Sequence, residues 1–210
     1  MTKSQELAVE AIIGMLENHP AENEIPLGVS NRHIHLTEEA LEALFGSGYE
    51  MTKIKDLGQP GQFAAKETVC IAGKKGSFAN VRVLGPVRMQ NQVEISRSDA
   101  FILGVNPPVR LSGNLDGAAD VCVIGPKGMM VMSNSTIIAK PHIHMTPKDA
   151  DYYQVKDKDL VSVELRGNKR ITIHDVEIRV TGQSALEFHL DTDEANAAGV
   201  KSGMMVQIIK

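Results

Sequence analysis

The sequence has few cysteines, few aromatic residues and no long apolar run. Its two cysteines, Cys70 and Cys122, lie far apart without CxxC or metal-type spacing, so we expect small buried side chains in a reducing compartment. Aromatic residues make up 4% and the formal net charge is −4, which argues against nucleic-acid binding. No apolar run approaches the roughly 20 residues of a membrane span, and no signal-peptide pattern is present. These absences predict a cytoplasmic protein that binds neither nucleic acid nor membrane.

The first twenty residues differ in character from the rest of the chain. Val9, Ile12, Ile13 and Leu16 recur at helical spacing and form one apolar stripe, and Pro20 follows the stripe. The pattern predicts an amphipathic helix over residues 1–20. Such a helix either packs on the domain that follows or serves as a detachable docking segment, and the sequence leaves both interpretations open.

From Ile25 onward the sequence consists of short β-rich segments separated by Gly, Pro, Asn and Lys-Gly turns. Many short strands with few helices favour a mainly β fold built from barrels or sandwiches. Short helices are expected where a Thr, Ser or Asp N-cap precedes a helical pattern, at residues 37–46, 96–104, 146–154 and 191–199.

A repeat runs through these segments. His-Ile-His occurs at residues 33–35 and again at 142–144, each time followed by a Thr-capped helix pattern. Residues 93–105 align without a gap to residues 188–200, which places Glu94 opposite His189. The chain is therefore expected to hold two similar domains from an internal duplication, over residues 25–115 and 116–210. Exchange of strands between the halves, for example of the C-terminal strand, is the alternative to this division.

The repeated histidines are candidate metal ligands. On a strand, residues two apart point to the same face, so each His-x-His pair can direct both imidazoles at one ion. The aligned third residues give two sets, each of which leaves a coordination position open as catalytic sites do. Imidazole and carboxylate ligands suit Zn²⁺, with other divalent first-row metals as alternatives. The two sets are His33, His35 and Glu94, and His142, His144 and His189.

Arginines near one of these sets indicate the substrate chemistry. Arg82 and Arg88 flank a Gly-Pro turn, and Arg88 lies six residues before Glu94. Beside a metal, an Arg can bind phosphate or a developing oxyanion. Walker A, GxGxxG and GxSxG patterns are missing from the sequence, which argues against nucleotide hydrolysis, Rossmann cofactors and serine acyl-enzymes. Metal with Arg and no nucleophilic side chain suggests attack by water or a bound anion on an activated carbonyl.

Seven blocks, in this order, resemble the PduL-type phosphotransacylase family (phosphate propanoyltransferase). The resemblance covers essentially all of residues 25–210. The blocks are IPLGVSNRHIHL, QPGQFAAKETV, NVRVLGPVR, QVEISRSDA, RLSGNL, HIHMTPKDA and LDTDEANAAG.

The resemblance implies two β-barrel domains and two Zn²⁺ ions per chain, held mainly by the two sets of residues named above. It implies that a short-chain acyl-CoA, propanoyl-CoA or acetyl-CoA, and phosphate are interconverted with acyl phosphate and CoA. Arg88 would bind phosphate as the catalytic residue. The residues implied in CoA binding are Val29, Ser30, Asn31, Lys75, Arg82 and Asn196.

The resemblance also bears on partners and location. Family members in bacterial microcompartments carry a short amphipathic helix that docks to shell or cargo proteins, and residues 4–19 fit that description. A homo-oligomer and a role in propanediol degradation are further expectations. Two other functions stay open. They are a zinc-dependent thioester hydrolase, which has no use for a phosphate-binding Arg88, and a non-catalytic metal-binding microcompartment component.

Overall fold

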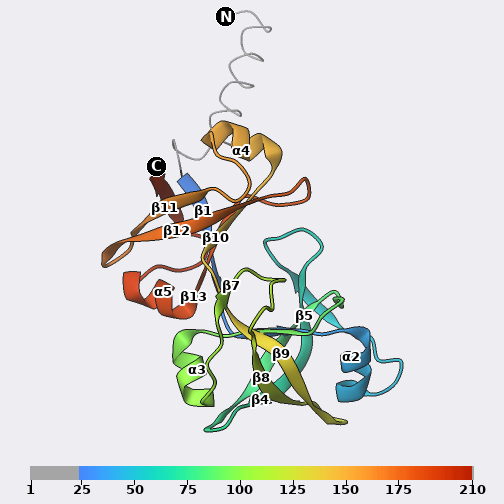
Figure 1. Ribbon diagram of the computed structural model, residues 1–210. Coiled ribbons are helices and arrows are strands. Elements are labelled where there is room, and N and C mark those ends of the chain that lie inside the picture. Colours follow the sequence, from blue (N-terminus) through green and yellow to red (C-terminus); the bar gives the residue numbers. More distant parts are fainter. Residues whose placement is uncertain (1–23, 210) are drawn as a thin grey trace, which may run out of the picture.

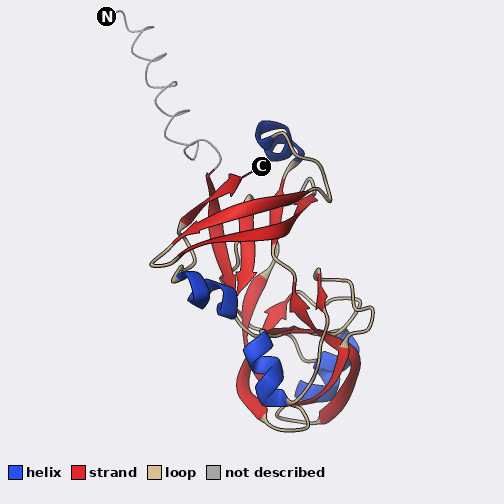
Figure 2. Ribbon diagram, turned by 60° about the vertical axis from the view of Figure 1, so that its left-hand side comes forward, coloured by secondary structure: helices blue, strands red, loops and turns tan. Residues whose placement is uncertain are grey.

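The short strands form two six-stranded β-barrels in the computed structural model, which describes residues 24–209. The barrels lie one above the other, with short helices on their outer surfaces (Figures 1 and 2). The prediction of a mainly β fold with two similar barrels is confirmed. The predicted helix at residues 1–20 lies outside the described residues.

Each barrel is a ring of six hydrogen-bonded strands. The first barrel runs, in spatial order, β4 (Phe63–Ala72), β5 (Ser77–Gly85), β2 (His33–His35), β6 (Gln92–Glu94), β9 (Met129–Ala139) and β8 (Ala119–Ile124), which pairs back with β4. The second runs β11 (Leu160–Arg166), β12 (Arg170–Val180), β10 (His142–Met145), β13 (Glu187–Asp191), β1 (Glu24–Ser30) and β14 (Met205–Ile209), which pairs back with β11. Two further strands lie beside the first ring, β3 (Lys53–Asp56) on β4 and β7 (Val109–Arg110) on β9.

The two rings repeat the same pattern of strand directions. In both, the His-x-His strand pairs in parallel with one neighbour, β5 or β12, and antiparallel with the other, β6 or β13. The strand after that, β9 or β1, is again parallel. The sequence repeat is therefore a structural repeat of the whole barrel.

The halves of the chain exchange their first strands. Strand β1 precedes the first barrel in sequence but lies in the second, whereas β9 precedes β10 and lies in the first. The division expected after residue 115 is wrong, because β8 and β9 both follow it and complete the first barrel. The suggested transfer of the C-terminal strand is also wrong, since β14 closes the second barrel. The exchanged strands are instead those that lead into each His-x-His segment.

The four predicted helices are present, and their caps explain where they start. They are α2 (Glu38–Phe45), α3 (Arg97–Leu103), α4 (Pro147–Tyr153) and α5 (Thr192–Ala198). The N-cap side chains of Thr37, Ser96, Thr146 and Asp191 each accept a hydrogen bond from a backbone N–H in the first turn. In the last three, the N3 carboxylate also accepts from the N-cap backbone, which completes a capping box.

Each barrel has its own hydrophobic core, and the cores orient the histidines. Ile34 and Ile143, the middle residues of the two His-Ile-His segments, are both 0% exposed and belong to separate core clusters. Because successive residues on a strand alternate faces, the flanking histidines must point out of the core. The core residues thus direct the imidazoles to the outside of each barrel.

Direct hydrogen bonds join the barrels. The N–H of Ser98, on α3, donates to Asp193 Oδ2, on α5, at 2.8 Å. Gln59, in the loop between β3 and β4, exchanges two hydrogen bonds with the backbone of Ala185, just before β13. Both contacts link a segment of the first barrel to a segment of the second.

Two expectations drawn from absences can be compared with the structure. Cys70 and Cys122 are free thiols, as expected, but both are half-buried rather than fully buried. Among residues 24–209, no helix combines the length and apolarity needed to cross a membrane.

Glu194, the capping-box residue of α5, predicts a pH dependence of stability. Burial, with the charges of Asp191 and Asp193, raises its pKa from 4.5 to about 7. Since folding favours the neutral acid, this contribution is fully present below pH 4.5 and is lost as the pH rises through about 7. We expect the free energy of unfolding to fall more steeply between pH 5 and pH 8 in the wild type than in Glu194→Gln. The expected difference is on the order of 2 kcal/mol.

Urea unfolding at several pH values measures this difference. Glu39→Gln, at an exposed position in α2, serves as the control and should keep the wild-type slope. Identical pH profiles for Glu194→Gln and the wild type would contradict the prediction.

Candidate active site

The first candidate metal cluster is set by the register of two short strands. β2 and β6 pair antiparallel, with His33 opposite Glu94. His35 follows on the same face, so three potential ligand atoms lie within 4.8 Å of one another. His33 Nε2 and Glu94 Oε2 are 3.5 Å apart, and all three residues are buried.

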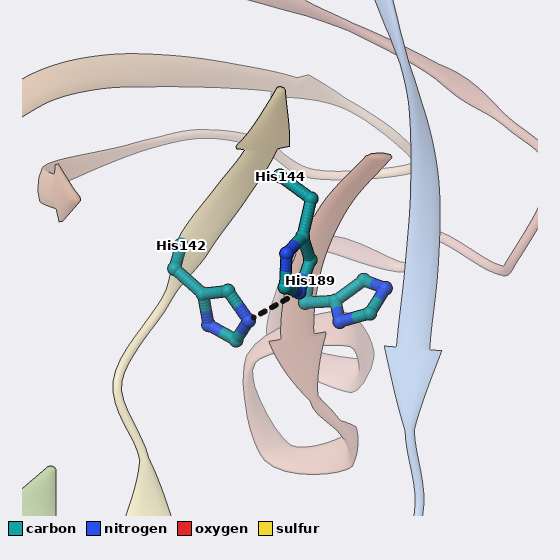
Figure 3. A group of neighbouring side chains, drawn as sticks. All are labelled: His142, His144 and His189. Atoms are coloured by element: carbon teal, nitrogen blue, oxygen red, sulfur yellow. Dashed lines mark hydrogen bonds between the residues drawn. The ribbon is translucent and has the colours of Figure 1, made fainter. Parts of the chain in front are cut away.

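The second cluster uses the same register in the other barrel. β10 and β13 pair antiparallel, with His142 opposite His189. The three imidazole rings converge, with centroids 4.8 to 5.3 Å apart (Figure 3). His142 Nε2 lies 3.1 Å from His144 Nε2, the contact drawn as a dashed line in Figure 3. Both predicted sets are thus brought together, one per barrel.

Backbone carbonyls fix which nitrogen of the first histidine faces each cluster. His33 Nδ1 lies 2.8 Å from the carbonyl oxygen of Asn31, and His142 Nδ1 lies 2.7 Å from that of Lys140. A carbonyl oxygen only accepts, so each Nδ1 must carry the proton and donate it. When the ring is neutral, its Nε2 keeps the lone pair, and this is the arrangement found in metal-binding histidines.

The protonation states of four of the six candidate ligands also fit a cation, whereas the charge of Glu94 raises the pKa of His33 against the effect of burial. Burial lowers the pKa of His35 and His144 to about 3 and that of His142 to about 4, and neighbouring imidazoles lower each further. Burial opposes ionisation of Glu94, but the charges of His33 and His35 outweigh it and lower the pKa of Glu94. At neutral pH these three imidazoles are neutral donors and Glu94 is an anion. Their residue types and geometry therefore fit a divalent metal such as Zn²⁺.

One cavity of about 800 Å³ contains both clusters. It lies between the barrels and is also lined by four of the six residues implied in CoA binding, namely Val29, Ser30, Asn31 and Arg82, and by Arg88. Lys75 and Asn196 are not part of its lining. Lys75 lies in the exposed turn after β4, and Asn196 is exposed on α5.

Arg88 enters this cavity without a carboxylate partner among residues 24–209. Its guanidinium donates long hydrogen bonds to Ser112 Oγ, at 3.3 Å, and to Gln62 Oε1, at 3.4 Å. Its backbone N–H donates to the carbonyl oxygen of Leu36 at 2.8 Å, which anchors it beside the end of β2. Burial lowers the pKa of this guanidinium, as does the charge of Arg179, while Glu94 opposes the shift.

Sequence reasoning missed several residues of the cavity. Arg179 lines it from β12, next to His144 in the strand ladder, and its side chain forms no hydrogen bond or ion pair within the described residues. Gln62, Ser112 and Glu187 also line it. Gln62 and Ser112 fall in the blocks QPGQFAAKETV and RLSGNL, which carry the family resemblance. Nothing in the spacing of these blocks relates the two residues to Arg88.

Comparison with known proteins shows the family of the chain. A family model described as phosphate propanoyltransferase matches residues 26–201. The chain belongs to the phosphate propanoyltransferase family. It is similar to the phosphate propanoyltransferase of Thermotoga maritima, 57% identical over 96% of this chain and 95% of the relative. The phosphate propanoyltransferases of Lachnoclostridium phytofermentans and Enterococcus faecalis are 53% and 42% identical, over 88% and 96% of this chain and 87% and 95% of the relatives.

The family membership confirms the resemblance that the sequence blocks carry. It also confirms the prediction that the chain is an acyltransferase, the class to which phosphate propanoyltransferases belong.

Proposed function

We propose that this protein transfers a short acyl group, propanoyl or acetyl, between CoA and phosphate. The observation that supports this most directly is that two donor clusters line a single cavity together with the guanidinium groups of Arg88 and Arg179, neither of which has an ion-pair partner in residues 24–209. The clusters suit cations that activate a carbonyl, and the guanidinium groups suit a phosphate dianion.

The reaction forms one bond and breaks one bond. An oxygen of HPO₄²⁻ attacks the thioester carbonyl carbon, the new C–O bond forms, and the C–S bond breaks. The departing thiolate of CoA takes up the proton that phosphate loses, so acyl phosphate and CoA thiol are the products. No acyl-enzyme is required, and neither cysteine lines the cavity.

Two arginines are suited to bind the phosphate. Arg88 has only the neutral partners Ser112 and Gln62, and Arg179 has no partner in the described residues. The charge of Arg179 lowers the pKa of Arg88, so the two repel each other while the site is empty of anion. A dianion between them would relieve this repulsion and would be held for attack at a high effective concentration.

The donor clusters would hold two Zn²⁺ ions, one with His33, His35 and Glu94 and the other with His142, His144 and His189. When bound, the ions would supply Lewis acids that lower the cost of negative charge on the carbonyl oxygen or the leaving sulfur. Burial of His33, His35 and Glu94 would limit the access of water to the first cluster, which favours phosphate over hydrolysis.

The CoA thioester would enter along the part of the cavity lined by Val29, Ser30, Asn31 and Arg82. Lys75 and Asn196 would serve the distant phosphates, because both are exposed outside the cavity and CoA is an extended molecule. Residues 4–19 would direct the protein to a microcompartment through the apolar stripe in their sequence.

Release of CoA from propanoyl-CoA by the Zn²⁺-loaded protein should depend on phosphate. A thiol reagent follows the release of CoA, and metal analysis of the same sample should find two ions per chain. Equal release with and without phosphate would indicate a thioester hydrolase instead. Metal without any turnover would indicate a non-catalytic metal-binding protein.

Arg88→Ala and Arg179→Gln should each raise the KM for phosphate by about 10- to 100-fold, the loss expected for a charge-assisted hydrogen bond. The metal content should stay unchanged. Arg170→Gln is the matched control, because Arg170 lies on the same strand as Arg179 but pairs with Glu164 outside the cavity. An unchanged KM in either cavity variant would remove that arginine from phosphate binding.

Deletion of residues 1–20 should leave the phosphate-dependent activity intact and abolish co-purification with microcompartment shells. Activity and shell association of the full-length and shortened proteins are compared side by side. Loss of folding on deletion would mean instead that this segment packs on the barrels.

A further inference from the structure

The third residue of each cluster has a polar neighbour two positions earlier on its strand. Gln92 precedes Glu94 on β6, and Glu187 precedes His189 on β13. In the antiparallel ladders Gln92 lies opposite His35, and Glu187 lies opposite His144. The two polar residues therefore occupy equivalent places in the two barrels, on the same face as the candidate ligands.

Gln92 holds Glu94 as a hydrogen-bond donor. Its Nε2 lies 2.6 Å from Glu94 Oε1, and the side chain is buried. The backbone N–H of Gly113 donates to Gln92 Oε1 at 2.8 Å, while Nε2 also donates to Ser112 Oγ at 2.8 Å. Because Oε1 must face the donor from Gly113, the amide NH₂ must face the carboxylate of Glu94.

Glu187 holds His189 as a hydrogen-bond acceptor. Its Oε2 lies 2.6 Å from His189 Nε2, and Gln59 Nε2 donates to the same oxygen at 3.2 Å. An ionised carboxylate only accepts, so His189 carries its proton on Nε2 and leaves Nδ1 for the cluster.

The space for the Glu187 carboxylate is provided by two glycines from different parts of the fold. A Cβ atom at Gly28, on β1, would lie 2.6 Å from Glu187 Oε1, and one at Gly58 would lie 2.3 Å from Oε2. Any side chain at either position would displace the carboxylate. Glu187 is therefore closely fitted against His189.

We propose that Gln92 and Glu187 are a matched pair of positioning residues, one for the third ligand of each metal site. An amide donor orients the carboxylate ligand Glu94, and a carboxylate acceptor orients the imidazole ligand His189. Gln92 donates a hydrogen bond and Glu187 accepts one, because the third ligand is a carboxylate in the first barrel and an imidazole in the second. This inference rests on the two-metal site of the proposed function and assigns a role to two residues outside the ligand sets.

Exchanging the two supporting residues tests the pairing. Gln92→Glu places two carboxylates side by side, and Glu187→Gln replaces the acceptor by an amide that can present a donor to His189. Each variant should weaken only the site in its own barrel, by about 10- to 100-fold in Zn²⁺ affinity. Competition with a chromophoric chelator measures both affinities, and the absorption spectrum of bound Co²⁺ reports the altered ligand geometry.

The site in the other barrel is the internal control for each variant. Glu164→Gln is a second control, since Glu164 accepts hydrogen bonds from Arg166 and Arg170 in the second barrel and does not line the cavity. It should leave both Zn²⁺ affinities unchanged. Thermal unfolding of all variants separates a loss of metal affinity from a loss of folding.

A compensating change provides the sharper test. Glu94→His alone would set an imidazole N–H against the amide NH₂ of Gln92, whereas Glu94→His with Gln92→Glu recreates the arrangement of the second barrel. The double variant should bind Zn²⁺ at this site at least 10-fold more tightly than Glu94→His alone. No gain in the double variant, or unchanged affinities in both single exchanges, would overturn the pairing while leaving the proposed function standing. A wild-type protein that binds no metal would overturn both.

Discussion

The antiparallel pairing of a three- or four-residue His-x-His strand with the strand that carries the third donor is the constraint on which the site depends. The register sets His33 opposite Glu94 and His142 opposite His189. Side chains 61 and 47 positions apart in sequence therefore meet on adjacent strands rather than on loops. A shift by one residue would turn every donor into the core and Ile34 or Ile143 out of it. Burial of Ile34 and Ile143 therefore fixes the strand register, and the register fixes the positions of the donor side chains.

The cavity between the barrels brings together side chains from both barrels. Each barrel contributes one donor cluster and at least one arginine without an ion-pair partner in the described residues, Arg82 and Arg88 from the first and Arg179 from the second. The charges of Arg88 and Arg179 repel each other in the cavity, whereas the imidazoles of His142 and His144 are neutral at neutral pH and add no further charge. The repulsion between the two arginines lowers the stability of the protein at the cavity, and binding of an anion would remove this repulsion. Such a local cost is typical of functional sites.

Local patterns in the sequence predicted the helices and the donors well. Caps such as Thr37 and Asp191 act within one turn, and the His-x-His spacing needs only the alternation of a strand. Glu94 was found because the gap-free repeat placed it opposite His189. The exchanged strands were not predicted, since the pairing of β1 with β13 joins segments about 160 residues apart that have no local signature. Arg179, Gln92 and Glu187 were missed for the same reason, because their roles depend on neighbours that only the closed barrels supply.

The reciprocal exchange of β1 and β9 has a consequence for how the molecule is made. Strand β1 is synthesised before the other described strands, yet both of its hydrogen-bonded neighbours, β13 and β14, follow it by more than 150 residues. The second barrel cannot close until β13 and β14 have been synthesised, and such distant pairings slow folding because a long loop must close first. Cutting the gene after residue 115 would leave each fragment without strands that its barrel needs, so neither half is an autonomous unit. The exchange of strands therefore makes the folding of each repeat depend on the presence of the other.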